Sequence, residues 1–266
     1  MRIARILESG GRETYAIEED DGLIRAGGDP FAGGLRPVGE RIEAKHWLAP
    51  IEPRAILCIG KNYLAHAQEF DGTAPEYPVL FMKNPAAATG HEQPVIIPKV
   101  CEDEVDYEGE LAVVIGMAAR DVAPEDALGH VLGYTAANDI SARIWQKDKG
   151  GSQWCRGKGF DSFAPMGPVL VTADEFGDSG GVALRTRVNG DERQSGNTDD
   201  MLYSIAELIA FLSQDTTLLP GTVILTGTPE GVGWARTPKV TLKPGDEIEV
   251  EIDGIGVLRS PVEAAS

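Results

Sequence analysis

Alternation of apolar and polar residues predicts short β-strands in the first fifty positions. This period-two pattern occurs at residues 2–7, 14–17 and 23–24, with glycine-containing turns between the segments. Pro50 and Pro53 then precede a compact apolar run that starts at Ala55. We therefore expect a small N-terminal β domain over residues 1–50 and a main domain over residues 51–266.

The pattern in the rest of the chain predicts an α+β fold dominated by strands. Apolar runs, several rich in β-branched residues, predict strands at residues 55–60, 94–98, 111–115, 168–172, 184–188, 222–225 and 247–252. Helical spacing is clearest at residues 63–70, 124–128 and 201–213. The sequence contains no internal repeat or low-complexity tract, so it predicts packed layers rather than a repeat architecture.

The charge balance argues against two classes of partner. The chain has 42 Asp and Glu against 24 Lys and Arg, a formal net charge of -18, which opposes nucleic-acid phosphates and anionic lipid surfaces. We expect neither a nucleic-acid partner nor a membrane partner. An anionic substrate would need a local exception, either a bound cation or a few well-placed basic side chains.

Cysteine usage and the N-terminal sequence predict a cytoplasmic protein. Cys58, Cys101 and Cys155 are odd in number and form no C-x-x-C pair, so we expect neither a disulfide framework nor a thiolate zinc site. The N-terminus carries Glu8 and alternating polar residues where a secretion signal needs an apolar run. No later stretch has the length and apolar character of a membrane span.

Three acidic residues are candidates for a metal site. In a strand, Glu108 and Glu110 project from the same face and lead into the apolar run 111–115, where unpaired buried charges would need a cation. Taken alone, such a pair is more often the solvated start of a strand. Asp139, which follows the apolar stretch 131–137, could complete an all-oxygen site that suits Mg²⁺ or Mn²⁺ better than zinc.

A His-x-x-Glu pair is a candidate catalytic base. We expect Asn62 to cap a short helix whose i, i+3 spacing puts His66 and Glu69 on one side. A carboxylate that holds one imidazole nitrogen fixes the tautomer and raises the basicity of the ring, as a base that activates water requires. The alternative is a surface helix with a chance pair. The other histidines, which lack such a partner, are His46, His91 and His130.

The glycine-rich segments do not predict a nucleotide site. Residues 151–159 lack the spacing of a phosphate-binding loop, and Gly159 stands where that loop needs Ser or Thr. Residues 227–233 lack the glycine order of a dinucleotide loop. The polar segment 145–154 is either a mobile loop of the active site or an ordinary surface connection.

Seven short blocks occur in an order that resembles the fumarylacetoacetate hydrolase family. They are residues 59–63 with His66 and Glu69, 81–85, 106–116, 138–139, 158–161, 189–190 with Gln194, and 226–233. The resemblance runs from about residue 50 to the C-terminus, and the N-terminal segment resembles that of bacterial isomerase and decarboxylase members. It implies a mixed β-roll of strands wrapped with short helices, usually as a homodimer.

The resemblance also implies roles for individual residues. The implied catalytic residues are His66, Glu69 and Lys158, the metal ligands are Glu108, Glu110 and Asp139, and the substrate-binding residues are Arg143, Gln146, Thr228 and Lys83. The dyad of the family lies on a lid that orders over substrate. Lys83 is open to another interpretation, because a lysine before the turn at 84–85 could simply be solvated.

These inferences predict a Mg²⁺- or Mn²⁺-dependent enzyme acting on a small anionic 2-oxo acid. We expect hydrolysis of a carbon–carbon bond in an acylpyruvate such as fumarylpyruvate, with pyruvate leaving as its enolate. Arg143, Lys158 and the cation would supply the positive charge that a dianionic substrate needs. The alternatives are a decarboxylase of the oxaloacetate or oxopentenetricarboxylate type, a 2-hydroxyhepta-2,4-diene-1,7-dioate isomerase, and a non-catalytic ligand-binding protein of the same fold.

Overall fold

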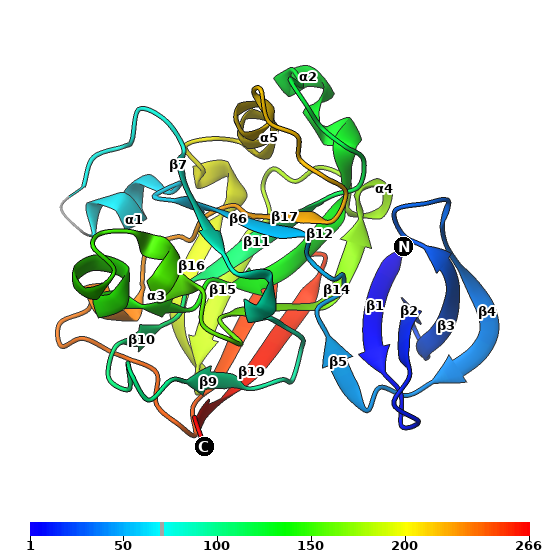
Figure 1. The fold of residues 1–266 in the computed structure, drawn as a ribbon, viewed down its shortest axis with the longest axis horizontal. Helices are drawn as coiled ribbons and strands as arrows, with labels where there is room; N and C mark the ends of the chain where they lie inside the picture. Colours follow the sequence, from blue (N-terminus) through cyan, green and yellow to red (C-terminus); the bar gives the residue numbers. More distant parts are fainter. Residues whose placement is uncertain (70–71) are drawn as a thin grey trace.

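A twelve-stranded sheet runs through the computed structural model, which describes residues 1–69 and 72–266 (Figure 1). Along the sheet the order is β4-β3-β2-β1-β14-β12-β11-β17-β6-β7, with β5 beside β1 and β8 beside β14. The strands are β1 (Arg2–Leu7), β2 (Glu13–Glu19), β3 (Gly22–Asp29), β4 (Gly34–Ile42), β5 (His46–Leu48), β6 (Ala55–Gly60), β7 (Val79–Lys83), β8 (Ala88–Thr89), β11 (Gly109–Ile115), β12 (Val131–Asn138), β14 (Ala164–Thr172) and β17 (Thr222–Leu225).

A second sheet of five strands packs against the first within the described residues. Its order is β16-β15-β18-β19-β9, and a short ladder joins β10 (Val105–Asp106) to β13 (Ser141–Ala142). The five strands are β9 (Val95–Ile97), β15 (Ala183–Val188), β16 (Asp191–Asn197), β18 (Glu247–Ile252) and β19 (Gly256–Ala264). Leu111 of the first sheet and Val250 of the second belong to one buried apolar cluster, so a core lies between the two layers.

The described helices are short and lie around the sheets. They are α1 (Leu64–Gln68), α2 (Pro124–Ala127), α3 (Trp154–Lys158), α4 (Ala173–Phe176), α5 (Ile205–Ser213), a π-helix η3 (Trp145–Lys149), and the 3-10 turns η1 (Pro85–Ala87), η2 (Leu128–His130), η4 (Thr198–Asp200) and η5 (Gly233–Ala235). None of the helices in the described ranges has the length and apolar character needed to cross a membrane. The strand-dominated α+β prediction is confirmed.

Two predicted helices begin later or end earlier than the sequence pattern indicated. The helix predicted at 201–213 begins at Ile205, because Ser204 and Glu207 form a capping box that fixes the first turn there. The helix predicted at 63–70 covers Leu64–Gln68. Its last predicted position, residue 70, lies outside the described part of the chain.

Strand β11 lies in the interior of the large sheet, and its first residues lie beside the site. It pairs antiparallel with β12 on one side and β17 on the other, and all seven of its residues are buried. Coverage of both faces explains why residues 111–115 are continuously apolar rather than alternating. Polar side chains at the start of this strand are therefore carried into the interior.

The N-terminal segment continues the large sheet. In Figure 1 its strands form the lobe at the right, and β1 is hydrogen-bonded to β14 through the pairs Arg2↔Val171 and Ile3↔Leu170. The ring of Trp47 on β5 packs edge to face against the ring of His91, which lies outside the N-terminal segment, with ring centroids 5.4 Å apart. The division into two domains near residue 50 stays a prediction.

Candidate active site

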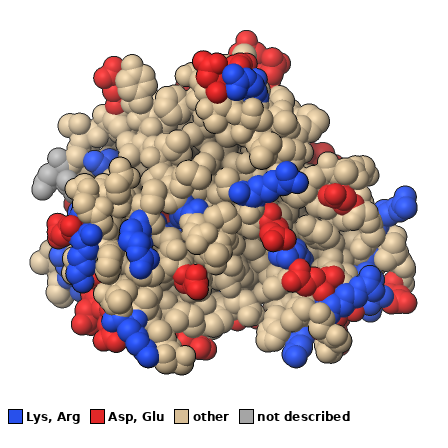
Figure 2. Space-filling view, viewed as in Figure 1, with Lys and Arg blue, Asp and Glu red and all other residues tan. Residues whose placement is uncertain are grey.

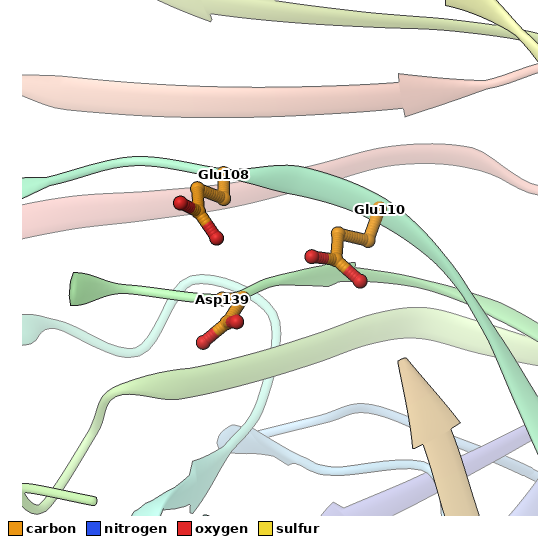
Figure 3. Close-up of side chains that lie close together, drawn as sticks. All are labelled: Glu108, Glu110 and Asp139. Carbon is orange, nitrogen blue, oxygen red and sulfur yellow. The ribbon is translucent and has the colours of Figure 1, made fainter. Parts of the chain in front are cut away.

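Three carboxylates meet where β11 begins and β12 ends. Glu108, Glu110 and Asp139 each offer an oxygen, and these oxygens lie within 4.8 Å of one another (Figure 3). Pairing of Gly109 with Asn138 brings the two chain segments together. The three residues are 4%, 2% and 0% exposed, so the alternative of a solvated strand start is wrong for Glu108 and Glu110.

Two buried lysines contact this cluster. Lys158 on α3 donates to Glu108 Oε2 at 2.6 Å and to Asp139 Oδ2 at 2.7 Å. Burial opposes its charged form, but Asp139 and Glu108 outweigh burial and raise the pKa of Lys158. Lys83 on β7 donates to Asp139 Oδ1 and to the carbonyl of Ile140, and its side chain is fully buried. The alternative of a solvated Lys83 is therefore wrong.

Arg143 joins the cluster to a fourth buried acid. Its Nη1 lies 2.6 Å from Glu108 Oε1, while its Nε and Nη2 donate to Asp106 Oδ2 at 2.9 and 2.7 Å. Its Nη1 also donates to Gln146 Oε1 at 3.2 Å. Although burial favours the neutral form of Glu108, the Lys158 and Arg143 cations hold the pKa of this carboxyl below its ordinary value.

Glu110 provides the strongest argument that the cluster fits a divalent cation. The ion pairs of Lys83, Lys158 and Arg143 described above go to other acids, whereas Glu110 accepts a hydrogen bond from the Gly227 N–H at 2.7 Å. Burial, followed by repulsion from Asp139 and Glu108, raises the pKa of Glu110 well above its ordinary value. An all-oxygen donor set of this kind suits Mg²⁺ or Mn²⁺, and a cation would remove this penalty.

The predicted dyad forms on α1. His66 Nδ1 lies 2.9 Å from Glu69 Oε2, and the His66 side chain is only 9% exposed, so the chance surface pair is wrong. Asn62 does not cap this helix. Tyr63 occupies the N-cap position, and the buried Asn62 amide instead exchanges hydrogen bonds with the backbone of Tyr203 and donates to that of Thr226. A fully buried amide requires such partners, which tie the entry of α1 to the main sheet.

These groups surround a pocket of about 190 Å³. It is lined by Ile59, Gly60, Lys61, His66, Phe81, Glu108, Glu110, Arg143, Gln146, Lys147, Trp154, Lys158 and Thr228. The pocket is smaller than the roughly 300–1,000 Å³ typical of sites for drug-sized ligands, so it suits a small ligand. Three of the predicted site residues, Glu69, Lys83 and Asp139, lie behind this lining.

Thr228 lines the pocket, but its hydroxyl is already bonded to the protein. Thr228 Oγ1 donates to the Gly109 carbonyl at 2.8 Å and accepts from Gln194 Nε2 at 2.7 Å. These bonds hold the start of β11 in place. Its predicted role as an anchor for the substrate carboxylate stays a prediction.

The segment 145–154 contributes Gln146, Lys147 and Trp154 to the pocket lining, so the alternative of an ordinary surface connection is wrong, and its mobility stays a prediction. Residues Trp145–Lys149 form the π-helical turn η3, which packs against α3. Gly157 permits this contact, because a Cβ there would lie 2.4 Å from the Gln146 backbone nitrogen. Trp154 packs edge to face on Phe81, with ring centroids 5.3 Å apart. A π-turn is a frequent feature of functional sites.

Sequence reasoning missed Lys61, Lys147 and Asp106. Lys61 and Lys147 line the pocket, and each adjoins a residue that was singled out, Asn62 and Gln146 respectively. Lys61 also has a left-handed backbone with φ of 58°, which a sequence pattern does not reveal for a non-glycine residue. Asp106 precedes Glu108 at the same period of two, which was the available signal.

Family comparison agrees with this arrangement. Residues 55–263 match the family described as fumarylacetoacetate (FAA) hydrolase C-terminal, and residues 1–50 match the one described as Rv2993c-like, N-terminal. The chain therefore belongs to the fumarylacetoacetate hydrolase family, and the resemblance inferred from its motifs is confirmed.

Individual relatives of known name are 39–48% identical to this chain. The chain is 48% identical over 216 residues to oxaloacetate tautomerase fahd2, mitochondrial, of Xenopus laevis. The aligned region covers 81% of this chain and 67% of that protein. It is 42% identical over 250 residues to human oxaloacetate tautomerase FAHD2A, mitochondrial, covering 94% and 79%. The structure of 5-carboxymethyl-2-hydroxymuconate delta-isomerase from Mycobacterium smegmatis shares 39% identity over 100% of both chains, with a TM-score of 0.83.

Proposed function

We propose that this chain is a divalent-cation-dependent enzyme that interconverts the enol and keto forms of a small 2-oxo dicarboxylate, with oxaloacetate as the candidate substrate. The observation that carries this proposal is the buried cluster of Glu108, Glu110 and Asp139 beside a pocket that also contains His66. The relatives described above, oxaloacetate tautomerases and an isomerase, favour proton transfer over hydrolysis.

The residues around the pocket supply the groups that such a proton transfer needs. Mg²⁺ or Mn²⁺ held by the three carboxylates would act as a Lewis acid toward a 2-oxo acid. Lys158 keeps its ammonium protonated between Glu108 and Asp139, where it can stabilise negative charge that develops on the enolate oxygen. His66, with Nδ1 held by Glu69, would accept the proton from the carbon beside the ketone through Nε2, and the enolate oxygen would take a proton from solvent to give the enol. In the reverse direction the enol hydroxyl would lose its proton to solvent and His66 would return a proton to the carbon.

Lysines at the pocket favour a substrate with a second carboxylate. Arg143 and Lys158 pair with acids of the protein, and Lys61 and Lys147 add two more basic side chains to the lining of the same pocket, from two other segments. Burial lowers the pKa of Lys147 most, and the nearby Arg143 and Lys239 cations lower it further, while Asp148 acts in the opposite direction. Figure 2 shows several basic side chains over α1 and α3 on this otherwise acidic protein.

Hydrolysis of an acylpyruvate is the second candidate. The bond between His66 and Glu69 is the arrangement that activates water, and the dyad could serve that reaction without any other change to the site. The two reactions differ in their products, because tautomerisation leaves the carbon skeleton intact and hydrolysis releases pyruvate. Product analysis therefore separates the two candidates directly.

A substrate panel with Mg²⁺ tests the proposal. Enol oxaloacetate, an acylpyruvate and keto oxaloacetate are supplied separately, and enol loss, pyruvate release and carbon dioxide release are measured. We expect rapid enol loss without carbon dioxide, and a drop on the order of a hundredfold or more for His66→Ala. Gln68→Ala, which changes an exposed neighbour on α1, should match wild type. Rapid pyruvate release from the acylpyruvate alone would instead establish the hydrolase.

A further inference from the structure

Glu69 is bonded at both of its carboxylate oxygens. Oε2 holds His66 Nδ1 at 2.9 Å, and Oε1 accepts a hydrogen bond from the Gly231 N–H at 2.7 Å. The carboxylate therefore connects the imidazole to the backbone of a distant segment, residues 229–236. The orientation of His66 depends on where that segment places the Gly231 peptide.

The Gly231 backbone is held in turn, on its carbonyl side, by two side chains. Its carbonyl accepts from Tyr107 Oη at 3.1 Å and from Arg236 Nε and Nη2, both at 3.2 Å. Arg236 Nη2 also donates to the Arg193 carbonyl at 2.6 Å. Gly231 has a φ of 103°, and a Cβ on it would lie 2.1 Å from the Arg193 carbonyl oxygen, so this peptide orientation requires glycine.

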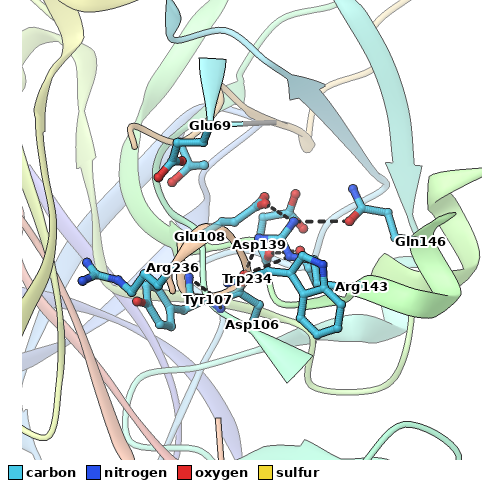
Figure 4. A network of polar contacts seen from close by, with 12 residues as sticks. Glu69, Asp106, Tyr107, Glu108, Asp139, Arg143, Gln146, Trp234 and Arg236 are labelled. Atoms are coloured by element: carbon cyan, nitrogen blue, oxygen red, sulfur yellow. Dashed lines mark hydrogen bonds and ion pairs between the residues drawn. The ribbon is translucent and has the colours of Figure 1, made fainter. Parts of the chain in front are cut away.

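The other end of the segment is bound to the carboxylate side of the site. Asp106 accepts from the backbone N–H groups of Gly233 at 2.8 Å and Trp234 at 2.9 Å, and it also holds Arg143, the partner of Glu108 (Figure 4). The segment 229–236 is thus anchored at both ends to groups that surround the pocket. Its hydrogen bonds connect the dyad to the carboxylate side of the site.

We propose that Arg236 and Tyr107 are positioning residues for the catalytic dyad, acting on His66 through the backbone of Gly231 and the Glu69 carboxylate. Neither side chain lines the pocket, so their influence on the reaction passes through this chain of hydrogen bonds. Groups that orient a catalytic imidazole from outside the site fix its tautomer and ring direction. The inference rests on the proposed function, because it takes His66 to be the base.

A double-mutant cycle tests the inference. Arg236→Met removes the donors to Gly231 while keeping a side chain of similar length, and Glu69→Ala removes the link to His66. On the reaction that wild type turns over, Arg236→Met should lower kcat on the order of tenfold with KM nearly unchanged. In the Glu69→Ala background the same substitution should have no further effect, because the path to His66 is already broken.

Two further variants separate positioning from folding. Arg193→Met changes the neighbouring side chain, which pairs with Asp191, but keeps the backbone carbonyl that Arg236 contacts, so kcat should equal that of wild type. Tyr107→Phe removes one hydroxyl with little change of volume, and it should lower kcat in the same direction but by less. If Arg236→Met fails to fold, the cycle of Tyr107→Phe with Glu69→Ala decides the question.

The possible results separate failure of the positioning role from failure of the proposed function. The inference would be overturned if Arg236→Met lowered kcat by the same factor in the wild-type and Glu69→Ala backgrounds, or lowered it in neither. In both cases the effect of Arg236 would not depend on Glu69. Full activity of Glu69→Ala would instead remove the dyad from the proposed function. If Glu69→Ala lowered kcat severely while Arg236→Met left kcat unchanged, only the positioning role would be rejected, and the proposed function would stand.

Discussion

At the scale of single residues, Glu110 differs from the other members of its cluster. The nearby cations pair with Glu108 and Asp139, while Glu110 is buried and accepts a hydrogen bond from a backbone N–H. Burial, more than any other cause, raises the pKa of Glu110. A buried carboxylate without a charge partner destabilises a folded protein. The same residue should therefore weaken the metal-free state and strengthen metal binding.

Glu110→Gln should separate these two effects. The amide oxygen still accepts from Gly227, so the thermal midpoint of the metal-free protein should be unchanged or higher. Excess Mn²⁺ should stabilise wild type by about 2.7 kcal/mol at a concentration of about 100 times Kd, and the variant by much less. Thermal unfolding with and without Mn²⁺ measures both. Glu102→Gln, an exposed substitution, should respond as wild type, and an equal Mn²⁺ response in Glu110→Gln would exclude Glu110 as a ligand.

Lys147→Met tests the recognition of a second carboxylate. Loss of one charge-assisted contact is worth about 1.5–3 kcal/mol, so KM for oxaloacetate should rise on the order of tenfold or more while kcat changes little. Lys149→Met is the matched control, because Lys149 lies on the same turn but over the Trp145 ring rather than in the pocket lining. Steady-state kinetics on both variants gives the answer. Equal KM values for the two would contradict a role for Lys147 in binding.

At the scale of elements, the sequence predicted buried strands well, and it did not predict features that depend on contacts between distant segments. Strand β11 is covered on both faces and its apolar run predicted it well, and the spacing of Glu108 and Glu110 predicted their common direction. The π-turn η3 was not predicted, because it depends on the close approach of Gly157, which lies eight or more positions further along the chain. Asn62 was assigned to a local cap, whereas long-range partners determined its position.

Gly157→Ala should disturb α3 and the lysine that it carries. Its Cβ would lie 2.4 Å from the Gln146 nitrogen and 2.7 Å from the Ala142 carbonyl oxygen, so α3 must move. We expect the free energy of unfolding to fall by about 1–3 kcal/mol, as in overpacked interiors, and activity to fall because Lys158 is displaced. Urea denaturation and kinetics measure the two effects. Gly129→Ala, with no atom within 4 Å of its added Cβ, should change neither.

At the scale of the whole molecule, His91 joins strand β5 of the N-terminal segment to strand β19 of the second sheet. His91 is 7% exposed, its Nδ1 accepts from the Arg259 N–H at 3.1 Å, and its ring packs on Trp47. Burial lowers the pKa of His91 below that of an unfolded chain. The unfolded state therefore binds the proton more tightly, and protonation favours unfolding. The homodimer that the family resemblance implies stays a prediction at this scale.

His91→Asn should flatten the pH dependence of stability. The stability supplied by neutral His91 is complete above the unfolded pKa of about 6.5 and is lost as the pH falls through the lower folded pKa. Asparagine keeps an acceptor near Nδ1 but does not titrate. Urea unfolding at pH 7, 6 and 5 should show a smaller loss for His91→Asn than for wild type. His46→Asn, an exposed control, should follow wild type, and parallel curves for all three would contradict the assignment.

The most direct test of the proposed function is the decay of enol oxaloacetate, followed by its ultraviolet absorbance, with protein stripped of metal and then reloaded with Mg²⁺ or Mn²⁺. A reference with the same cation but no protein accounts for catalysis by the free ion. The reloaded protein should accelerate decay well beyond that reference, while stripped protein and reloaded Glu110→Gln should not. Equal acceleration by stripped protein, or none by reloaded protein, would contradict a cation-dependent tautomerase.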